Sequence, residues 1–125
     1  MKQIINTPHA PAPIGPYSQA VKVGNTLYVS GQVAINPATG DLVLDSIPIE
    51  TTQVMENLKA VLTEANATFD NIVMTTIFLS DMGNFAAVNE VYGKYFTADF
   101  PARATVAVKT LPKNVNVEIS VIAAL

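Results

Sequence analysis

The sequence predicts an α/β fold in which one sheet carries two helices on a single face, in the order β-β-α-β-α-β-β. Three observations predict it: short β-branched runs alternate with two segments of helical periodicity, half of the residues are hydrophobic, and no repeat or linker divides the chain. A chain of 125 residues fits one domain and buries roughly two thirds of the surface that its unfolded form exposes. Residues 1–125 are therefore expected to form a single domain.

The first half of the chain predicts a stiff loop, a hairpin and a helix. Four prolines within Pro8–Pro16 predict an extended loop that holds Tyr17 in a fixed place. Two β-prone runs flank Gly24–Asn25, a pair that suits a two-residue hairpin turn. Between about residues 48 and 65, apolar residues recur at helical spacing and predict an amphipathic helix. These apolar residues are Val54, Leu58, Val61, Leu62 and Ala65.

The second half of the chain predicts a strand, a helix and two further strands. Residues 71–81 are β-branched on both parities, which is typical of a strand covered on both faces. Apolar residues from Phe85 to Phe96 recur at helical spacing. Residues 103–108 and 115–123 read as strands joined through a short connection. Because strands joined by a helix run parallel and cross over right-handed, both helices are expected on one face of the sheet.

Alternation along the strands predicts which side chains share a face. Glu118 alternates with valine and isoleucine, whereas Arg103 and Thr105 alternate with alanine and valine. The apolar sets are expected to meet the helices, and the polar sets, with Ser30, to share the opposite face. If the last two strands form a hairpin centred near Pro112, Glu118 falls opposite or diagonal to Thr105 and within reach of Arg103.

The face opposite the helices is also expected to carry large apolar side chains. Tyr28, Phe78 and Ile122 fall on it by parity, and no third helix is predicted to cover them. This area is too apolar to remain in water, so we predict a homo-oligomer in which sheets cover one another.

Composition narrows the range of partners. The chain lacks cysteine, which excludes disulfides, thiolate zinc sites and a cysteine nucleophile and fits an intracellular, cytoplasmic protein. The net charge is −3, and the seven Lys and Arg residues are scattered, which disfavours nucleic acid as a partner. No apolar run approaches the roughly 20 residues of a membrane span, and the N-terminus does not resemble a signal peptide. A membrane partner is therefore not expected.

Few types of chemistry remain available. The only histidine, His9, lies in the proline-rich segment, which argues against a Ser-His-Asp triad. No metal-ligand cluster and no phosphate-binding glycine motif is present, so no metal is expected. Glu50 lies near a helix start, where acidic residues are common, and it is given no function.

Arg103 and Glu118 admit two interpretations. A partly buried ion pair between them could simply fix the strand register. Alternatively, Arg103 could act as a bidentate fork for a substrate carboxylate, with Glu118 as the acid/base group and with Ser30 and Tyr17 as a polar wall. The pattern alone leaves both interpretations open.

Four segments of the chain resemble one family. They are "IGPYSQ" at 14–19, "YVSGQVAINPATG" at 28–40, "VNEVY" at 88–92 and "FPARATVAVKTLPKNVNVEI" at 100–119. Over essentially the whole chain the sequence resembles the Rid family of reactive-intermediate deaminases, also called the YjgF family, and within it the RidA subgroup. The resemblance implies a chorismate-mutase-like fold and a homotrimer with clefts between its subunits. It further implies hydrolysis of imines and enamines such as 2-aminoacrylate to a 2-keto acid and ammonia, without a cofactor.

The resemblance also implies roles for particular residues. Arg103 matches the arginine that grips the substrate carboxylate, and Glu118 matches the acid that positions or activates water. Substrate-binding roles are implied for Tyr17, Ser30, Gly31, Asn89 and Thr105. Because Thr105 stands where many relatives have cysteine, no thiol-dependent behaviour is expected here.

Two alternative functions stay open. The same cleft could bind a 2-keto acid as a regulatory module without turnover, because the product also carries a carboxylate. Action on RNA is reported for some relatives, although the acidic pI of about 4.9 weighs against it.

Overall fold

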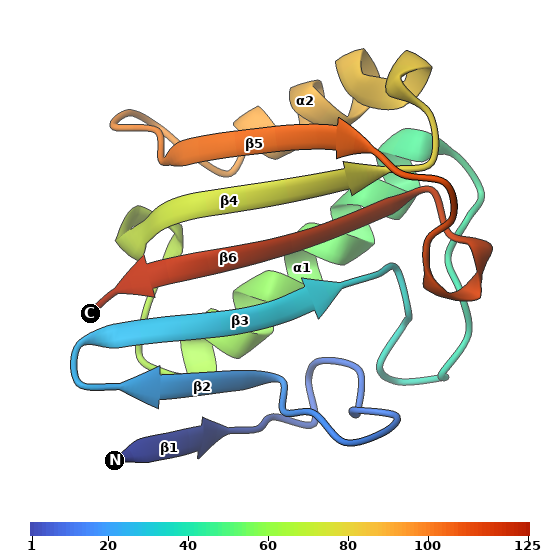
Figure 1. Ribbon diagram of the computed structural model, residues 1–125. Coiled ribbons are helices and arrows are strands. Elements are labelled where there is room, and N and C mark those ends of the chain that lie inside the picture. The colour runs from blue at the N-terminus through green and yellow to red at the C-terminus, as the bar shows by residue number, and fades with distance from the viewer.

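Six strands form one mixed sheet, one strand more than the sequence predicts, and both helices lie on the same face of it, as expected (Figure 1). The computed structural model describes residues 1–125. Its strands are β1 (Lys2–Ile5), β2 (Ala20–Val23), β3 (Thr26–Gln32), β4 (Ile72–Leu79), β5 (Ala102–Ala107) and β6 (Val117–Ala124). Its helices are α1 (Ile47–Glu64) and α2 (Phe85–Gly93).

The order of strands across the sheet is β1-β2-β3-β6-β4-β5. Only β4 and β5 pair in parallel, and every other neighbouring pair is antiparallel. The expected hairpin between the last two strands is therefore wrong, because β4 lies between β6 and β5 (Figure 1). The β6 strand is the more apolar of the two and occupies the centre of the sheet, where both of its edges are paired.

The strand β1 is an addition to the predicted order. It pairs antiparallel with β2, from Lys2 opposite Val23 to Ile5 opposite Ala20. Only its last residue, Ile5, is buried. A four-residue edge strand with one buried side chain has too little periodicity to be recognised before the proline-rich loop begins.

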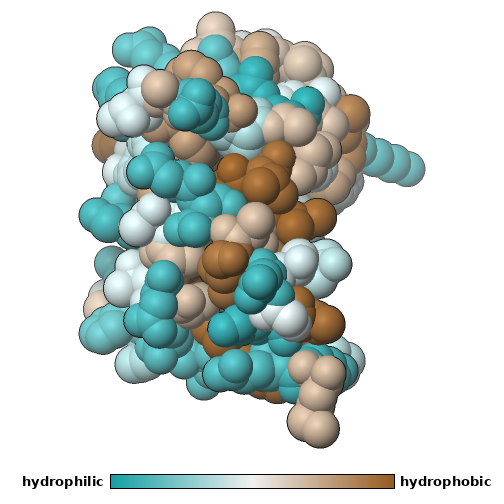
Figure 2. Space-filling view, turned by 90° about the vertical axis from the view of Figure 1, so that its left-hand side faces the viewer, coloured by the Kyte–Doolittle hydropathy of each residue, from teal (hydrophilic) through white to brown (hydrophobic).

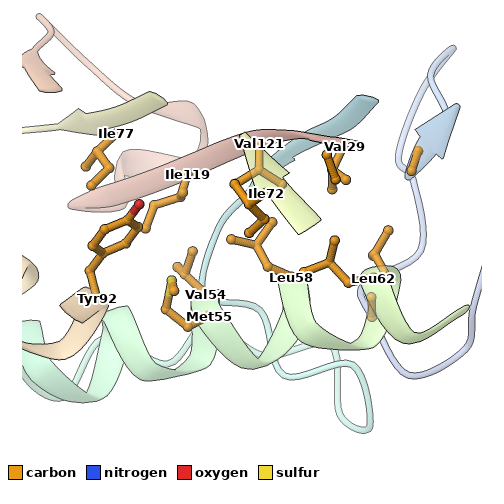
Figure 3. Close-up of a cluster of buried hydrophobic side chains, with 14 of the residues drawn as sticks. Val29, Val54, Met55, Leu58, Leu62, Ile72, Ile77, Tyr92, Ile119 and Val121 are labelled. Carbon is orange, nitrogen blue, oxygen red and sulfur yellow. The ribbon is translucent and has the colours of Figure 1, made fainter. Parts of the chain in front are cut away.

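The helix α1 packs against the sheet and supplies one side of the hydrophobic core. Its first turn is capped by Ser46, whose side chain accepts a hydrogen bond from the Ile49 backbone. The predicted apolar face is confirmed, and Figure 3 shows Leu58 and Leu62 pointing toward the sheet. Fully burying each such side chain contributes about 1.5–3 kcal/mol.

The helix α2 starts at Phe85 as expected and ends at Gly93, before the end of the predicted apolar pattern. Phe96 lies beyond the helix but is still buried, and its ring packs 4.9 Å from that of Tyr92. Neither helix combines the length and the hydropathy needed to span a membrane.

The sheet face turned away from the helices, called here the open face, is partly apolar. Tyr28 and Val106 remain 49% and 46% exposed on it. Its larger apolar side chains are Ile4, Val21, Val23, Tyr28, Met74, Phe78, Val106 and Ile122. In Figure 2, which views the sheet edge-on from the left of Figure 1, apolar atoms gather toward the side of this face. No helix covers this face (Figure 1).

Candidate active site

Arg103 lies on the helix side of the sheet. It pairs with Thr75, which is fully buried on the helix side, so the two side chains share that face. Its Nη1 donates a hydrogen bond to Asn89 Oδ1 at 2.7 Å. The expectation that Arg103 and Thr105 point away from the helices is wrong. The reason is that β5 is an exposed edge strand, where alternating polarity does not report the buried side.

A cavity of about 450 Å³ adjoins the Arg103 guanidinium. It is lined by Asn89, Tyr92, Gly93, Phe100, Pro101 and Arg103. A guanidinium has five N–H donors, and one hydrogen bond to Asn89 leaves the others available to a carboxylate.

Thr105 lies two residues farther along β5, opposite Ile77 and therefore on the same face as Arg103. Its Oγ1 is buried and has no hydrogen-bond partner in the chain. An unpaired buried hydroxyl is unfavourable, so a group from outside the chain, such as water or a second subunit, would be needed to satisfy it.

Glu118 lies on the open face, opposite Phe78. Its side chain is half-buried, and burial raises the pKa of its carboxyl above the ordinary value. Gly31 approaches it closely: a Cβ at that position would lie 2.5 Å from Glu118 Oε2. A side chain at position 31 would therefore displace the Glu118 carboxyl, and glycine leaves it room.

A second cavity, of about 470 Å³, contains Glu118 together with three other predicted site residues, Tyr17, Ser30 and Gly31. Its remaining lining residues are Pro11, Ala12, Ile14, Val33, Ile35, Pro112 and Lys113. A register shift in β3 between Val29 and Gln32 brings Ser30 and Gly31 to this position. Such irregularities are common beside active sites, because they redirect a side chain without ending the strand.

The loop that carries Tyr17 is fixed by a residue that the sequence analysis did not single out. The buried Gln19 amide donates to the backbone oxygens of Thr7 and Pro11, each at 3.0 Å, and accepts from the Thr7 N–H at 2.7 Å. Ser30 Oγ in turn donates to the backbone oxygen of Ser18 at 2.6 Å. These bonds connect the proline-rich loop to β3 and hold the wall of the cavity in place.

Glu50 has a structural role that the sequence analysis did not assign. Its carboxylate is fully buried at the start of α1 and accepts hydrogen bonds from the Asn116 backbone, the Asn116 side chain and the Val117 backbone at 2.8, 2.8 and 3.0 Å. These are the residues directly before Glu118. An acidic residue at a helix start has an ordinary explanation, so its sequence position did not reveal this contact.

The two cavities are separate within one chain. Arg103 is level with Thr75 on β4, and Glu118 is level with Phe78. Three residues along the strands and two strand spacings across them separate the Cα atoms by about 14 Å, on opposite faces. An intrachain Arg103–Glu118 ion pair is therefore excluded. No three His, Cys, Asp or Glu side chains gather closely enough to hold a metal ion.

Comparison with known proteins identifies the family. A family model described as Endoribonuclease L-PSP matches residues 7–125. The chain is 49% identical over 123 residues to a RutC family protein from Pyrococcus horikoshii, covering 98% of both chains. It is 46% identical over 123 residues to the 2-iminobutanoate/2-iminopropanoate deaminase of Mus musculus, covering 98% of this chain and 91% of the relative. A crystal structure of a Rid family protein of unknown function from Yersinia pestis matches with a TM-score of 0.98 and 51% identity, covering 100% of both chains. The chain therefore belongs to the Rid family, the family that the matching model describes as Endoribonuclease L-PSP.

Proposed function

We propose that the protein is a 2-iminobutanoate/2-iminopropanoate deaminase whose active site is completed between two subunits of a homotrimer. The observation that carries the proposal is the separation of Arg103 and Glu118 into two cavities on opposite faces of the sheet. One cavity has the Arg103 cation that can bind a carboxylate, and the other has the Glu118 carboxyl that can transfer protons. A relative named for this reaction is 46% identical over 123 residues.

The chemistry of the two halves fits hydrolysis of an imine. The Arg103 fork binds the substrate carboxylate and orients the electrophilic C2. Water adds to C2, and Glu118 accepts a proton from it. The protonated imine nitrogen becomes the amino group of the resulting carbinolamine. Glu118 then returns its proton to this nitrogen, the C–N bond breaks, and the C2 hydroxyl passes its proton to the departing ammonia as the carbonyl of the 2-keto acid forms. A carboxyl whose pKa is raised by burial suits both proton transfers, because its pKa lies closer to the working pH.

The open face supports assembly with further copies of the chain. It presents apolar side chains from several adjacent strands, including Tyr28 and Val106, which are about half exposed. Burying such a face against another sheet is favourable and would also bring the edge of one sheet toward the Glu118 cavity of a neighbour. Closed cyclic assembly of three subunits would create three equivalent sites.

The site does not favour RNA cleavage, the activity named in the description of the family model. Each cavity contains a single cation, Arg103 in one and Lys113 in the other. Binding to the RNA backbone depends on several basic groups arranged along a surface. One guanidinium beside a small cavity suits a single carboxylate better.

The test uses threonine dehydratase to generate 2-iminobutanoate and follows the formation of 2-ketobutyrate. The variants Arg103→Ala and Glu118→Gln are each expected to be inactive when assayed alone. After the two are unfolded together and reassembled in equal amounts, about a quarter of the wild-type activity should return, because one site in four receives both intact residues in a closed ring. No recovery on mixing would contradict a shared site.

The same assay separates catalysis from ligand sensing. Wild-type protein that binds 2-ketobutyrate saturably but does not accelerate its formation would be a non-catalytic binding module. That outcome would reject the deaminase proposal while leaving the carboxylate site in place.

A further inference from the structure

Three side chains of α2 form one continuous face toward β5. Phe85, Asn89 and Tyr92 are spaced i, i+4 and i+7, which places them on the same side of a helix. Two of them, Asn89 and Tyr92, belong to the "VNEVY" segment.

All three of these side chains contact the Arg103 guanidinium. The Cζ atom lies 5.3 Å from the Phe85 ring centroid and 5.2 Å from the Tyr92 ring centroid. Both distances are within the range of a cation–π interaction. Asn89 Oδ1 accepts from Nη1 at 2.7 Å, which fixes the rotation of the guanidinium plane. Asn89 therefore directs its oxygen at the arginine.

The Tyr92 ring is itself held in place from the sheet. Its hydroxyl donates to Thr75 Oγ1 at 3.0 Å, and both side chains are buried. Thr75 is the β4 residue paired with Arg103, so the bond links the ring to the strand next to the arginine. Figure 3 shows the Tyr92 ring extending from the helix toward the strands. Rigid neighbours on two elements thus surround a long and otherwise flexible side chain.

We propose that Phe85, Asn89 and Tyr92 are positioning residues that hold the Arg103 guanidinium in the orientation required to bind the substrate carboxylate. The inference rests on the proposed function for the identity of that carboxylate. It assigns Asn89 an action through Arg103 instead of a contact with substrate. A planar guanidinium suits this arrangement, because it can lie against aromatic rings while its N–H groups donate in fixed directions.

The first experiment measures binding of 2-ketobutyrate, a stable carboxylate that needs no turnover. Phe85→Leu should weaken its binding about fivefold, the effect expected from losing one ring beneath a partly exposed guanidinium. Phe85→Tyr keeps the ring and should bind within twofold of wild type. Phe69→Leu is the matched control, because Phe69 is also half-buried among aromatic residues but has no contact with Arg103. Equal affinities in Phe85→Leu and Phe69→Leu would overturn the proposal.

A second variant tests the hydrogen bond. In Asn89→Asp, a carboxylate next to the guanidinium would compete with the ligand carboxylate, and affinity should fall further than in Phe85→Leu. Unchanged or tighter binding would contradict a role that acts through Arg103.

A third measurement is independent of any ligand. The Arg103 Nε–H resonance, assigned by its loss in Arg103→Lys, should show a ring-current shift in wild type and in Phe85→Tyr. It should move toward the random-coil position in Phe85→Leu but not in Phe69→Leu. If the wild-type resonance has no ring-current shift, the proposal fails even where deamination is observed. If the shift is present and deamination is absent, only the proposed function fails.

Discussion

The guanidinium of Arg103 rests against two aromatic rings and donates to Asn89, whereas the carboxylate of Glu118 accepts no hydrogen bond within the chain. The arginine is held directly, by the side chains around it. Glu118 is held indirectly: Glu50 binds the two backbone residues before it, and Gly31 leaves space beside it.

This difference follows from the roles that we propose for Arg103 and Glu118. A permanently charged group that binds a carboxylate gains from a fixed orientation, because its protonation never changes. A carboxyl that exchanges protons gains from a tuned pKa, and hydrogen bonds to its charged form would lower that pKa. Burial without donors raises the pKa of Glu118 instead.

The largest loss of activity is expected when the subunits are separated, because the Arg103 cavity of one subunit then no longer meets the Glu118 cavity of another. Val106→Glu places a charge on the open face of β5, where Val106 is 46% exposed. Burying an unpaired carboxylate between sheets is strongly unfavourable, so the protein should sediment as a monomer. Deaminase activity should fall at least about a hundredfold, because neither half is complete alone.

Ile49→Glu is the control for this substitution. Ile49 is 48% exposed but lies in the first turn of α1, where a negative charge is favourable. This variant should assemble like wild type. An active Val106→Glu monomer would show that one chain contains a complete site.

A smaller loss of activity is expected when the planar guanidinium of Arg103 is replaced by the ammonium of lysine. Arg103→Lys keeps the charge but loses both the fork and the hydrogen bond to Asn89. Losing charge-assisted hydrogen bonds of about 1.5–3 kcal/mol should lower kcat/KM roughly 10- to 100-fold. The coupled dehydratase assay measures this loss, and turnover equal to wild type would remove Arg103 from the proposed site.

The parts of the fold that the sequence predicted are those with strong local periodicity. The apolar face of α1 and the alternation of Val117, Ile119 and Val121 in β6 are confirmed, because these elements bury one side deeply. Nearly every residue of β5 is exposed. The alternation of polar and apolar residues therefore could not indicate which face of the sheet carries Arg103.

Contacts between residues that are distant along the chain also could not be predicted from the sequence. Residues close along the chain suggested a hairpin of the last two strands, but the parallel crossover through α2 places β5 outside β4. The roles of Gln19 and Glu50 were also missed, since each depends on partners at least eight residues away. Such partners become visible only once the chain is folded.

A pH-dependent effect on stability is expected at Glu118. Because the folded-state pKa of this carboxyl lies above its ordinary value of 4.5, folding favours the protonated form. Its contribution to stability is therefore fully present below pH 4.5 and is lost as pH rises through the raised pKa. Glu118→Gln should consequently raise Tm at pH 7 while abolishing turnover, and its advantage over wild type should shrink toward pH 4.

Glu90→Gln provides the control, because Glu90 is exposed on α2. Its stability should stay within about 0.5 kcal/mol of wild type at every pH. A Glu118→Gln variant with a lower Tm than wild type at pH 7 would show that the Glu118 carboxylate has a favourable partner in the assembled protein.

The smallest effects concern two threonines on the helix side of adjacent strands, for which the same substitution should have opposite signs. Thr75 Oγ1 accepts from the Tyr92 hydroxyl, whereas Thr105 Oγ1 is buried without a partner. Thr75→Val leaves the Tyr92 hydroxyl unpaired and should destabilise the protein by about 1–3 kcal/mol. Thr105→Val removes an unpaired hydroxyl and should stabilise it by about 1 kcal/mol. Urea midpoints at constant m-value measure both changes, and destabilisation by Thr105→Val would mean that a neighbouring subunit or a bound water pairs with Oγ1.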